Sequence, residues 1–199
     1  MKRTSTLPIT DLENKWSDLN EFYWYQRAFN DEEIEKINII AKELPSQSGR
    51  AGREGASEIK ETRSSTVRWI ELNDNTAWIY QKLGEYIRVA NEGVWKFNWD
   101  GHTDTIQHTE YYASAKGKYD WHIDVGNGSM SMRKISAVLL LNDGYEGGKL
   151  QIKHIGENLK GNKGDLYIFP SYLLHRVTPV LKGTRRSLVL WAGGPEPFK

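Results

Sequence analysis

Residues 135–144 have the sequence ISAVLLLNDG, and this stretch indicates the fold class. A mostly apolar run over 135–141 is followed by Asn142, Asp143 and Gly144, three residue types that favour turns. Apolar runs of this length that end at such a cluster are typical of β-strands. The stretch therefore predicts a strand that ends in a turn.

Further strands are predicted around this one. Apolar and polar residues alternate over 150–153, and short apolar runs bounded by turn residues cover 165–169 and 186–191. The pattern begins at about Ile106. Short strands at this spacing, separated by Gly and Asn turns, indicate a sandwich or a barrel, so residues 106–192 are predicted to form a β core.

The residues before this core have helical patterns. Asn30 is suited to cap a helix, since acidic residues follow it directly and apolar residues then recur at helical spacing until Pro45. A second helix is predicted over 74–91, followed by an alternating run over 94–99. The fold class is therefore α+β, with N-terminal helices packed against a β core.

The chain is long enough for one domain and too short for two of ordinary size. We expect a single domain over 1–199, in which residues 1–105 provide helical support and a substrate loop. That loop is predicted over 46–57, which is polar, rich in glycine and without periodicity.

Composition excludes several classes of protein. The formal net charge is +1, which gives no reason to expect nucleic acid or an acidic membrane as a partner. There are no cysteines, so a metal would have to be bound by His, Asp or Glu. No apolar run has the length of a signal peptide core or a membrane span, and we expect a cytoplasmic protein.

Two His-x-Asp triplets stand out, one at 102–104 and one at 122–124. Composition alone yields roughly 0.25 such triplets by chance, so the context of each decides its meaning. On a strand, residues two apart face the same side, which would bring an imidazole and a carboxylate together. His102 lies among polar turn residues, whereas His122 lies among aromatic and aliphatic ones. The second triplet is the better candidate, and we expect the first to be dispensable.

A third ligand would complete a two-histidine, one-carboxylate site, which suits Fe(II). His108 and His154 have no distinguishing neighbours, but His175 precedes a turn and then a strand that begins with two arginines. Arg185, Ser187, Val189 and Trp191 share one face of that strand. If the face is interior, Arg185 would be a buried cation that a bound carboxylate could neutralise. The alternative is an arginine that faces solvent, which these residues alone favour.

Taken together, the motifs resemble those of the Fe(II)- and 2-oxoglutarate-dependent dioxygenases, in the prolyl 4-hydroxylase-like, PKHD-type branch. The resemblance covers roughly residues 108–192. Its parts are Tyr112, Gly117, Tyr119, His122 and Asp124 in the pattern Y-x4-G-x-Y-x2-H-x-D; the run LLLND with the following YEGGKL; FPS; and HRVTPV with Gly183 and Arg185.

The resemblance implies a double-stranded β-helix, also called a jelly roll or cupin-like fold. It implies Fe(II) as cofactor with 2-oxoglutarate and O2 as co-substrates. His122, Asp124 and His175 would be the iron ligands, and Arg185 would bind the distal carboxylate of 2-oxoglutarate. Tyr112 and Ser187 would be further contacts to that co-substrate. Lys149 departs from the family, many members of which have glutamate there, but it lies outside the implied metal centre.

The resemblance also implies hydroxylation of a prolyl residue in a peptide or protein, with succinate and CO2 as co-products. We expect the loop over 46–66, which contains Arg63, to control substrate access. The other residues expected near the substrate are Tyr111, Trp121, Met130, Arg133 and Trp191. Two alternatives stay open: the same chemistry on a free amino acid or other small metabolite, and a cupin-like module that binds a metal without turnover.

Overall fold

The computed structural model describes residues 3–5, 22–49, 62–153, 158–159 and 161–197. Within these residues a nine-stranded sheet forms the larger layer. Along the sheet its strands are β1 (Arg3–Ser5), β2 (Tyr23–Tyr25), β13 (Leu166–Pro170), β9 (Arg133–Leu140), β16 (Thr184–Gly193), β7 (Ile106–Tyr112), β5 (Thr66–Ile70) and β3 (Gln47–Ser48), with β6 (Gly101–His102) paired to β16. All these pairings are antiparallel except β1 with β2.

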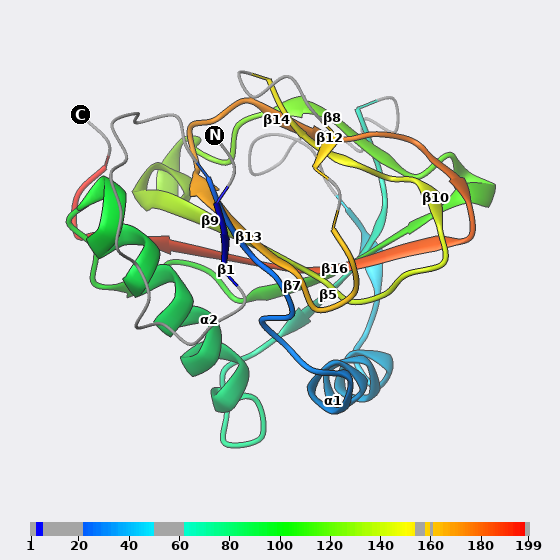
Figure 1. The fold of residues 1–199 in the computed structure, drawn as a ribbon, viewed down its shortest axis with the longest axis horizontal. Helices are drawn as coiled ribbons and strands as arrows, with labels where there is room; N and C mark the ends of the chain where they lie inside the picture. The colour runs from blue at the N-terminus through cyan, green and yellow to red at the C-terminus, as the bar shows by residue number, and fades with distance from the viewer. Residues whose placement is uncertain (1–2, 6–21, 50–61, 154–157, 160, 198–199) are drawn as a thin grey trace.

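A second sheet of five strands lies over one face of the first (Figure 1). Its order is β12 (Asn158–Leu159), β11 (Leu150–Ile152), β14 (His175–Val177), β8 (Lys118–His122) and β4 (Arg63–Ser64). The chain passes repeatedly between the two sheets: β7 leads to β8, β9 to β11, and β13 to β14. A separate pair, β10 (Glu146–Gly147) with β15 (Val180–Lys182), closes one end. The predicted jelly-roll core is confirmed, and so is the strand at 135–141.

Helix α1 spans Asp31–Lys42, as the capping pattern predicted. The Asn30 side chain accepts a hydrogen bond from the Glu33 main-chain N–H, and the Glu33 carboxylate accepts one from the Asn30 N–H. This reciprocal pair satisfies two donors that the first helical turn leaves without partners. The helix ends before Pro45, which could not continue it.

Helix α2 spans Ala77–Ala90 and therefore begins three residues later than predicted. A turn occupies the difference, because Thr76 Oγ1 accepts from the Asn73 main-chain N–H and donates to the Glu71 carbonyl. Beyond α2 the chain continues as one turn of π-helix, Asn91–Trp95, which overlaps the start of the alternating run over 94–99. The Asn91 side-chain amide stabilises this end by bonding both the N–H and the C=O of Phe97.

Both helices pack on the face of the large sheet that points away from the second sheet (Figure 1). Ile37, Leu83 and Ile87 are buried there against Leu139 and Leu188. A smaller apolar cluster lies between the sheets. Strand β9 is buried along its whole length because it has a packed layer on either side, which explains its continuous apolar sequence.

The first 105 residues provide strands as well as helices, which the periodicity did not predict. Strand β2 pairs with β13, and β5 pairs with β7, so both extend the core sheet. The expected substrate loop falls largely on residues 50–61, outside the described residues, as does His154. The described ends of that loop, β3 and β4, belong to different sheets. Among the described residues, no helix combines the length and apolar character that crossing a membrane requires.

Candidate metal centre

Three side chains meet where the second sheet faces the first. His122 is the last residue of β8 and pairs directly with His175, the first residue of β14. Asp124 lies in the bend after β8, so the triplet spans the end of that strand. Its main-chain N–H donates to the Ser171 carbonyl, and this bond folds the carboxylate back under the two imidazoles. One ligand atom from each residue lies within 4.8 Å of the others.

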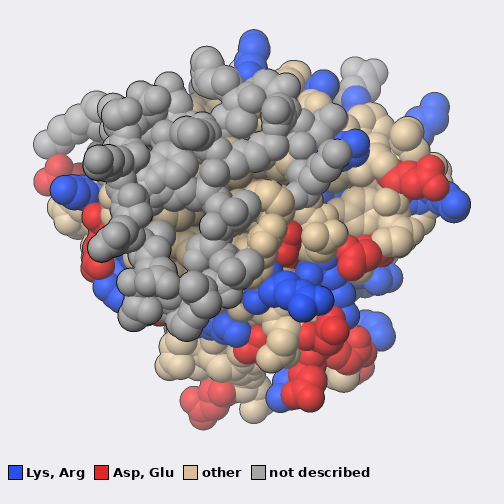
Figure 2. All heavy atoms as spheres, in the orientation of Figure 1, with Lys and Arg blue, Asp and Glu red and all other residues tan. Residues whose placement is uncertain are grey.

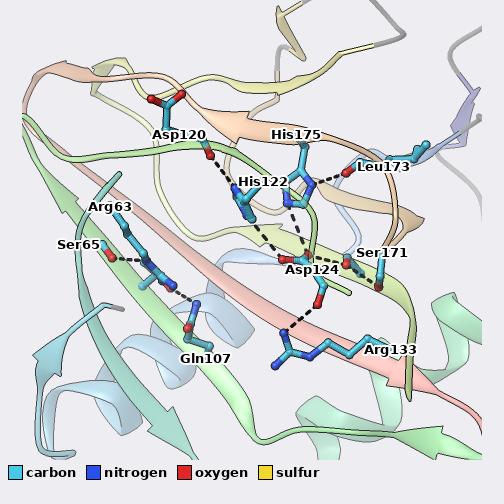
Figure 3. Close-up of polar contacts among 12 residues, drawn as sticks. Arg63, Ser65, Gln107, Asp120, His122, Asp124, Arg133, Ser171, Leu173 and His175 are labelled. Atoms are coloured by element: carbon cyan, nitrogen blue, oxygen red, sulfur yellow. Dashed lines mark hydrogen bonds and ion pairs between the residues drawn. The ribbon is translucent and has the colours of Figure 1, made fainter. Parts of the chain in front are cut away.

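The imidazoles are oriented by hydrogen bonds to main-chain carbonyls (Figure 3). Nδ1 of His122 lies 2.7 Å from the Asp120 oxygen, and Nδ1 of His175 lies 2.7 Å from the Leu173 oxygen. A carbonyl only accepts, so Nδ1 carries the proton and the Nε2 lone pair is available. The Nε2 atoms lie 3.6 and 3.5 Å from the two Asp124 oxygens, a spacing that suits three ligands around one ion.

The protonation states also suit a metal ion. Burial raises the pKa of Asp124, but the two imidazoles and a hydrogen bond from Ser136 outweigh burial and hold that pKa well below its ordinary value. Burial lowers the pKa of His175 to about 4. At neutral pH the carboxylate is therefore ionised and the His175 imidazole neutral, which are the forms that bind metals.

Arg133 supports the centre from the side of the large sheet. Its guanidinium makes two bonds to the Asp104 carboxylate, at 2.8 and 2.7 Å, and donates to the main-chain oxygen of Asp124 at 3.3 Å. It also lies 4.0 Å above the ring of Trp191. Asp104, from the triplet that we expected to be dispensable, is thus connected to the metal centre through Arg133.

His102, the other member of that triplet, is exposed and remote from the centre. It forms the two-residue strand β6, where a turn was expected, and its ring lies 4.8 Å from that of Tyr80. The prediction for the two histidines therefore agrees with the structure, since His122 lines the cavity and His102 does not. The expectation for Asp104 does not, because this residue bonds Arg133.

A cavity of about 450 Å³ opens beside the three ligands, between the two sheets. Arg185 lines it and is only 1% exposed, so the solvent-facing alternative is wrong. Its Nη1 donates to Ser187 Oγ at 2.9 Å, while Nε and Nη2 have no hydrogen-bond partner among the described residues. Burying a cation whose N–H donors lack hydrogen-bond partners costs free energy, so this arrangement fits a ligand with a carboxylate.

Tyr111, and not Tyr112, lies on the cavity side of β7. Alternate residues of a strand face opposite sides, and Tyr111 is paired with Arg185 across the sheet, with the guanidinium 5.4 Å from its ring. The Tyr112 hydroxyl instead donates to Glu110 on the other face. The assignment of Tyr112 to the co-substrate is therefore corrected, and Tyr111 is the tyrosine that lines the cavity.

The residues expected near the substrate separate into two groups. Arg63, Tyr111, Met130, Arg133 and Trp191 line the cavity, as does Ser187. Trp121 does not: it is 36% exposed on the outer face of the second sheet, with the Arg176 guanidinium 4.5 Å above its ring.

Sequence reasoning did not assign the roles of several residues around the centre. Ser136 Oγ donates to Asp124 and lies 2.9 Å from Ser171 Oγ, so a pair of serines positions the carboxylate. Ser136 had a signal, since it is a polar residue within an apolar strand. The Tyr119 ring stacks on His122 at 3.5 Å, and Arg63 covers that tyrosine at 4.6 Å. In Figure 3 the Arg63 side chain extends toward Gln107, another residue of the cavity wall.

Comparison with known proteins agrees with the fold. Residues 106–193 match the 2OG-Fe(II) oxygenase superfamily. A PKHD-type hydroxylase of Teredinibacter turnerae is 42% identical over 90 residues, which are 41% of this chain and 40% of that protein. One from Prochlorococcus marinus is 28% identical over 164 residues, 79% of this chain and 72% of that protein. The chain spans about two fifths of the length of the first curated relatives that it matches.

Solved structures share the fold at low sequence identity. A prolyl-4-hydroxylase of Pseudomonas putida has a TM-score of 0.68 at 19% identity, over 94% of this chain and 97% of that one. A prolyl hydroxylase of Trichoplax adhaerens, solved with a peptide fragment of hypoxia inducible factor, has a TM-score of 0.71 at 17% identity, over 93% and 86%.

The fold and the ligand set define a jelly-roll protein with a two-histidine, one-carboxylate centre. Residues 106–193 match the 2OG-Fe(II) oxygenase superfamily, so the resemblance predicted from the motifs is confirmed. That superfamily implies Fe(II), 2-oxoglutarate and O2, as expected, and the buried Arg185 and the three converging ligands fit that set.

Proposed function

We propose that this protein is an Fe(II)- and 2-oxoglutarate-dependent dioxygenase that hydroxylates a C–H bond of a prolyl residue in a peptide or protein. The observation that carries the proposal is one cavity with two different ends. Three side chains that could bind a metal converge at one end, and at the other lies a buried arginine, two of whose nitrogen donors have no partner among the described residues. A short ligand that chelates a metal and carries a distant carboxylate fits both ends.

In this proposal His122, Asp124 and His175 hold the iron, and Arg185 with Ser187 binds the distal carboxylate of 2-oxoglutarate. When bound, the iron and 2-oxoglutarate supply the oxidising chemistry, with succinate and CO2 as co-products. The protein positions both groups and leaves the cavity side of the centre open to O2 and substrate. We also propose that residues 1–105 and 106–192 act as one domain, since β2 and β5 extend the core sheet.

Several side chains around the centre protect and orient it. Burial keeps His175 and Asp124 away from bulk water. Tyr119 covers one face of the His122 ring, and Arg63 covers the tyrosine in turn. Excluding water from the centre prevents side reactions of the oxidising species, and fixing the imidazole planes keeps the open positions directed into the cavity.

A prolyl substrate is supported by the names of the relatives and by the cavity wall. The relatives are called PKHD-type hydroxylases, and the Trichoplax neighbour was solved with a peptide. Trp69 and Trp191 line the cavity and offer flat apolar surfaces suited to a pyrrolidine ring. The strand ends β3 and β4 lie at the cavity as well, since Gln47, Ser48 and Arg63 line it.

Charge distribution gives no reason to prefer a nucleic acid. Acidic and basic side chains are intermingled over the described part of the face in Figure 2, in keeping with the net charge of +1. Nucleic-acid readers ordinarily gather Lys and Arg into a stripe. A free amino acid or small metabolite remains the second candidate, because a cavity of about 450 Å³ can enclose one whole.

The test is succinate formation by the reconstituted protein. Protein loaded with Fe(II) and 2-oxoglutarate is exposed to O2 with proline-containing peptides, and succinate is measured together with the mass gain of one oxygen atom in the peptide. His175→Ala should lower succinate by more than about 100-fold, since even partners outside the ligand set are worth about 10–100-fold. His102→Ala, an exposed histidine outside the cavity, is the matched control and should keep wild-type turnover.

Three results would contradict parts of the proposal. Turnover with free proline but not with peptides would favour the small-metabolite substrate. No succinate from wild-type protein, despite tight metal binding, would favour a binding module without turnover. Loss of activity in His102→Ala and not in His175→Ala would refute the assigned centre.

A further inference from the structure

A second cavity, of about 280 Å³, adjoins the first, and Arg185 and Leu150 line both. It lies under the turn that carries Gly147 and Gly148 and is also lined by Tyr167 of β13. The proposed metal ligands are not among the residues that line it. It is therefore the part of the space between the sheets that surrounds Arg185.

Tyr167 is buried, and its hydroxyl has no hydrogen-bond partner among the described residues. The ring is held in place by Trp24, which stacks on it at 5.9 Å, and by Phe22 at 6.3 Å. Burial and the nearby Asp165 raise the pKa of Tyr167, whereas the charge of Arg185, which lines the same cavity, lowers it. Buried tyrosine hydroxyls ordinarily find a partner, so this one requires an explanation.

Glycines make room for both side chains. A Cβ at Gly148 would come within 2.9 Å of Arg185 Cδ, and one at Gly161 would come within 2.4 Å of the Tyr167 hydroxyl. Gly148 also has a φ of +56°, a conformation that other residues adopt at a cost. The absence of a side chain at these two positions therefore leaves the room that the Arg185 and Tyr167 side chains occupy.

The idle groups at this place are suited to bind an anion. Within the part of the chain that the structure describes, Nε and Nη2 of Arg185 are donors without partners, and the Tyr167 hydroxyl can donate as well. Asp143, which also lines the cavity, already accepts a hydrogen bond from the Lys163 main chain at 2.8 Å. A carboxylate placed between the arginine and the tyrosine would satisfy all three donors at once.

We propose that the Tyr167 hydroxyl binds the distal carboxylate of 2-oxoglutarate together with Arg185 and so helps to select a dicarboxylic co-substrate. This inference rests on the proposed function, because it names a further residue of the same co-substrate site. Tyr167 reaches the site from β13, which is separated from β16 by β9. The sequence separation between Tyr167 and Arg185 therefore gives no indication that they share a site.

The test compares two ligands that chelate a metal in the same way. 2-Oxoglutarate carries the distal carboxylate, whereas 2-oxobutanoate lacks it. Affinities are measured by calorimetry on protein loaded with Mn(II) in place of iron, which needs no turnover. Tyr167→Phe should weaken 2-oxoglutarate by about tenfold or more, the effect of losing a hydrogen bond to a charged group, and leave 2-oxobutanoate unchanged. Tyr86→Phe, which removes a hydroxyl on α2, is the control and should leave both affinities unchanged.

A melting curve without ligand adds an independent readout. Because the Tyr167 hydroxyl has no partner among the described residues, Tyr167→Phe should melt at or above the wild-type temperature. A lower melting temperature would show a structural partner for the hydroxyl and overturn the inference. So would a 2-oxoglutarate affinity within twofold of wild type, or an equal loss for both ligands. If wild-type protein binds no 2-oxoglutarate, the proposed function itself fails, which is a different result from failure in the variant alone.

Discussion

At the scale of single residues, the large sheet carries buried polar groups on both faces. Arg185 and Tyr167 lie on the face toward the cavity. His108 lies on the opposite face, under α1, and is 3% exposed, with neither ring nitrogen bonded among the described residues. Burial lowers the pKa of His108 to about 4. The imidazole is therefore held in its neutral form.

This burial should make stability depend on pH. The folded pKa of about 4 lies below the ordinary value of 6.5, so protons bind the unfolded chain preferentially. The contribution of His108 to stability is present above about pH 6.5 and is lost as the pH falls toward 4. It amounts to about 3 kcal/mol at most, from roughly 1.4 kcal/mol per pKa unit.

His108→Leu should flatten the dependence of the free energy of unfolding on pH between 6.5 and 4, measured by urea denaturation. His175 also has a lowered pKa, so part of the slope should persist. His102→Leu, at an exposed site, is the control and should retain the wild-type slope. An unchanged slope in His108→Leu would show that the buried imidazole does not disfavour protonation.

At the scale of elements, strand pairing places two residues from separate segments, Asp104 and Arg133, beside the bend that carries Asp124. Asp104 lies between β6 and β7, and Arg133 opens β9. Two hydrogen bonds from Arg133 to the Asp104 carboxylate join the start of β9 to the segment that precedes β7. Arg133 also donates a hydrogen bond to the main-chain oxygen of Asp124. This connection fixes the bend that carries the Asp124 carboxylate.

Asp104→Asn should weaken binding of Mn(II) by about tenfold, the lower end of the range for partners of metal ligands, while the melting temperature without metal changes little. Affinity is measured by electron paramagnetic resonance of free Mn(II). Asp104→Glu, which keeps the carboxylate, should recover part of the loss. Asp100→Asn, a nearby surface carboxylate, is the control. Wild-type affinity in Asp104→Asn would mean that Arg133 holds the bend without help.

At the scale of the whole molecule, the centre joins β8 and β14 and the bend that follows β8. A metal that binds only the folded chain stabilises it by about 2.7 kcal/mol at a concentration 100 times its Kd. For a chain of 199 residues this corresponds to a rise of roughly 5–10 °C in melting temperature.

We therefore expect Mn(II) to raise the melting temperature of wild-type protein by that amount, measured by differential scanning calorimetry. His175→Ala should lose the shift, and His102→Ala should keep it. A shift that persists in His175→Ala would place the metal elsewhere.

The sequence alone predicted the elements whose signals are local. The cap at Asn30, the apolar strand over 135–141 and the class of fold all follow from periodicity and turn residues, which act over a few neighbours. The ligand triad followed from motif order and resemblance, and the structure brings those three residues together. Strands such as β5 were missed because their identity depends on the sheet to which they pair.

Only the tertiary structure decided which side of each strand faces the cavity. The sequence placed Tyr112 at the co-substrate, but β7 turns Tyr111 inward because alternate residues face opposite sides. The sequence did not determine whether Arg185 faces solvent or the interior. The side chain is buried because the second sheet covers that face of β16. Asp104 and Tyr167 could not be assigned at all, since their partners are brought near only when distant strands pair. Local patterns determine what each segment can form, whereas the packing of segments determines which side chains meet.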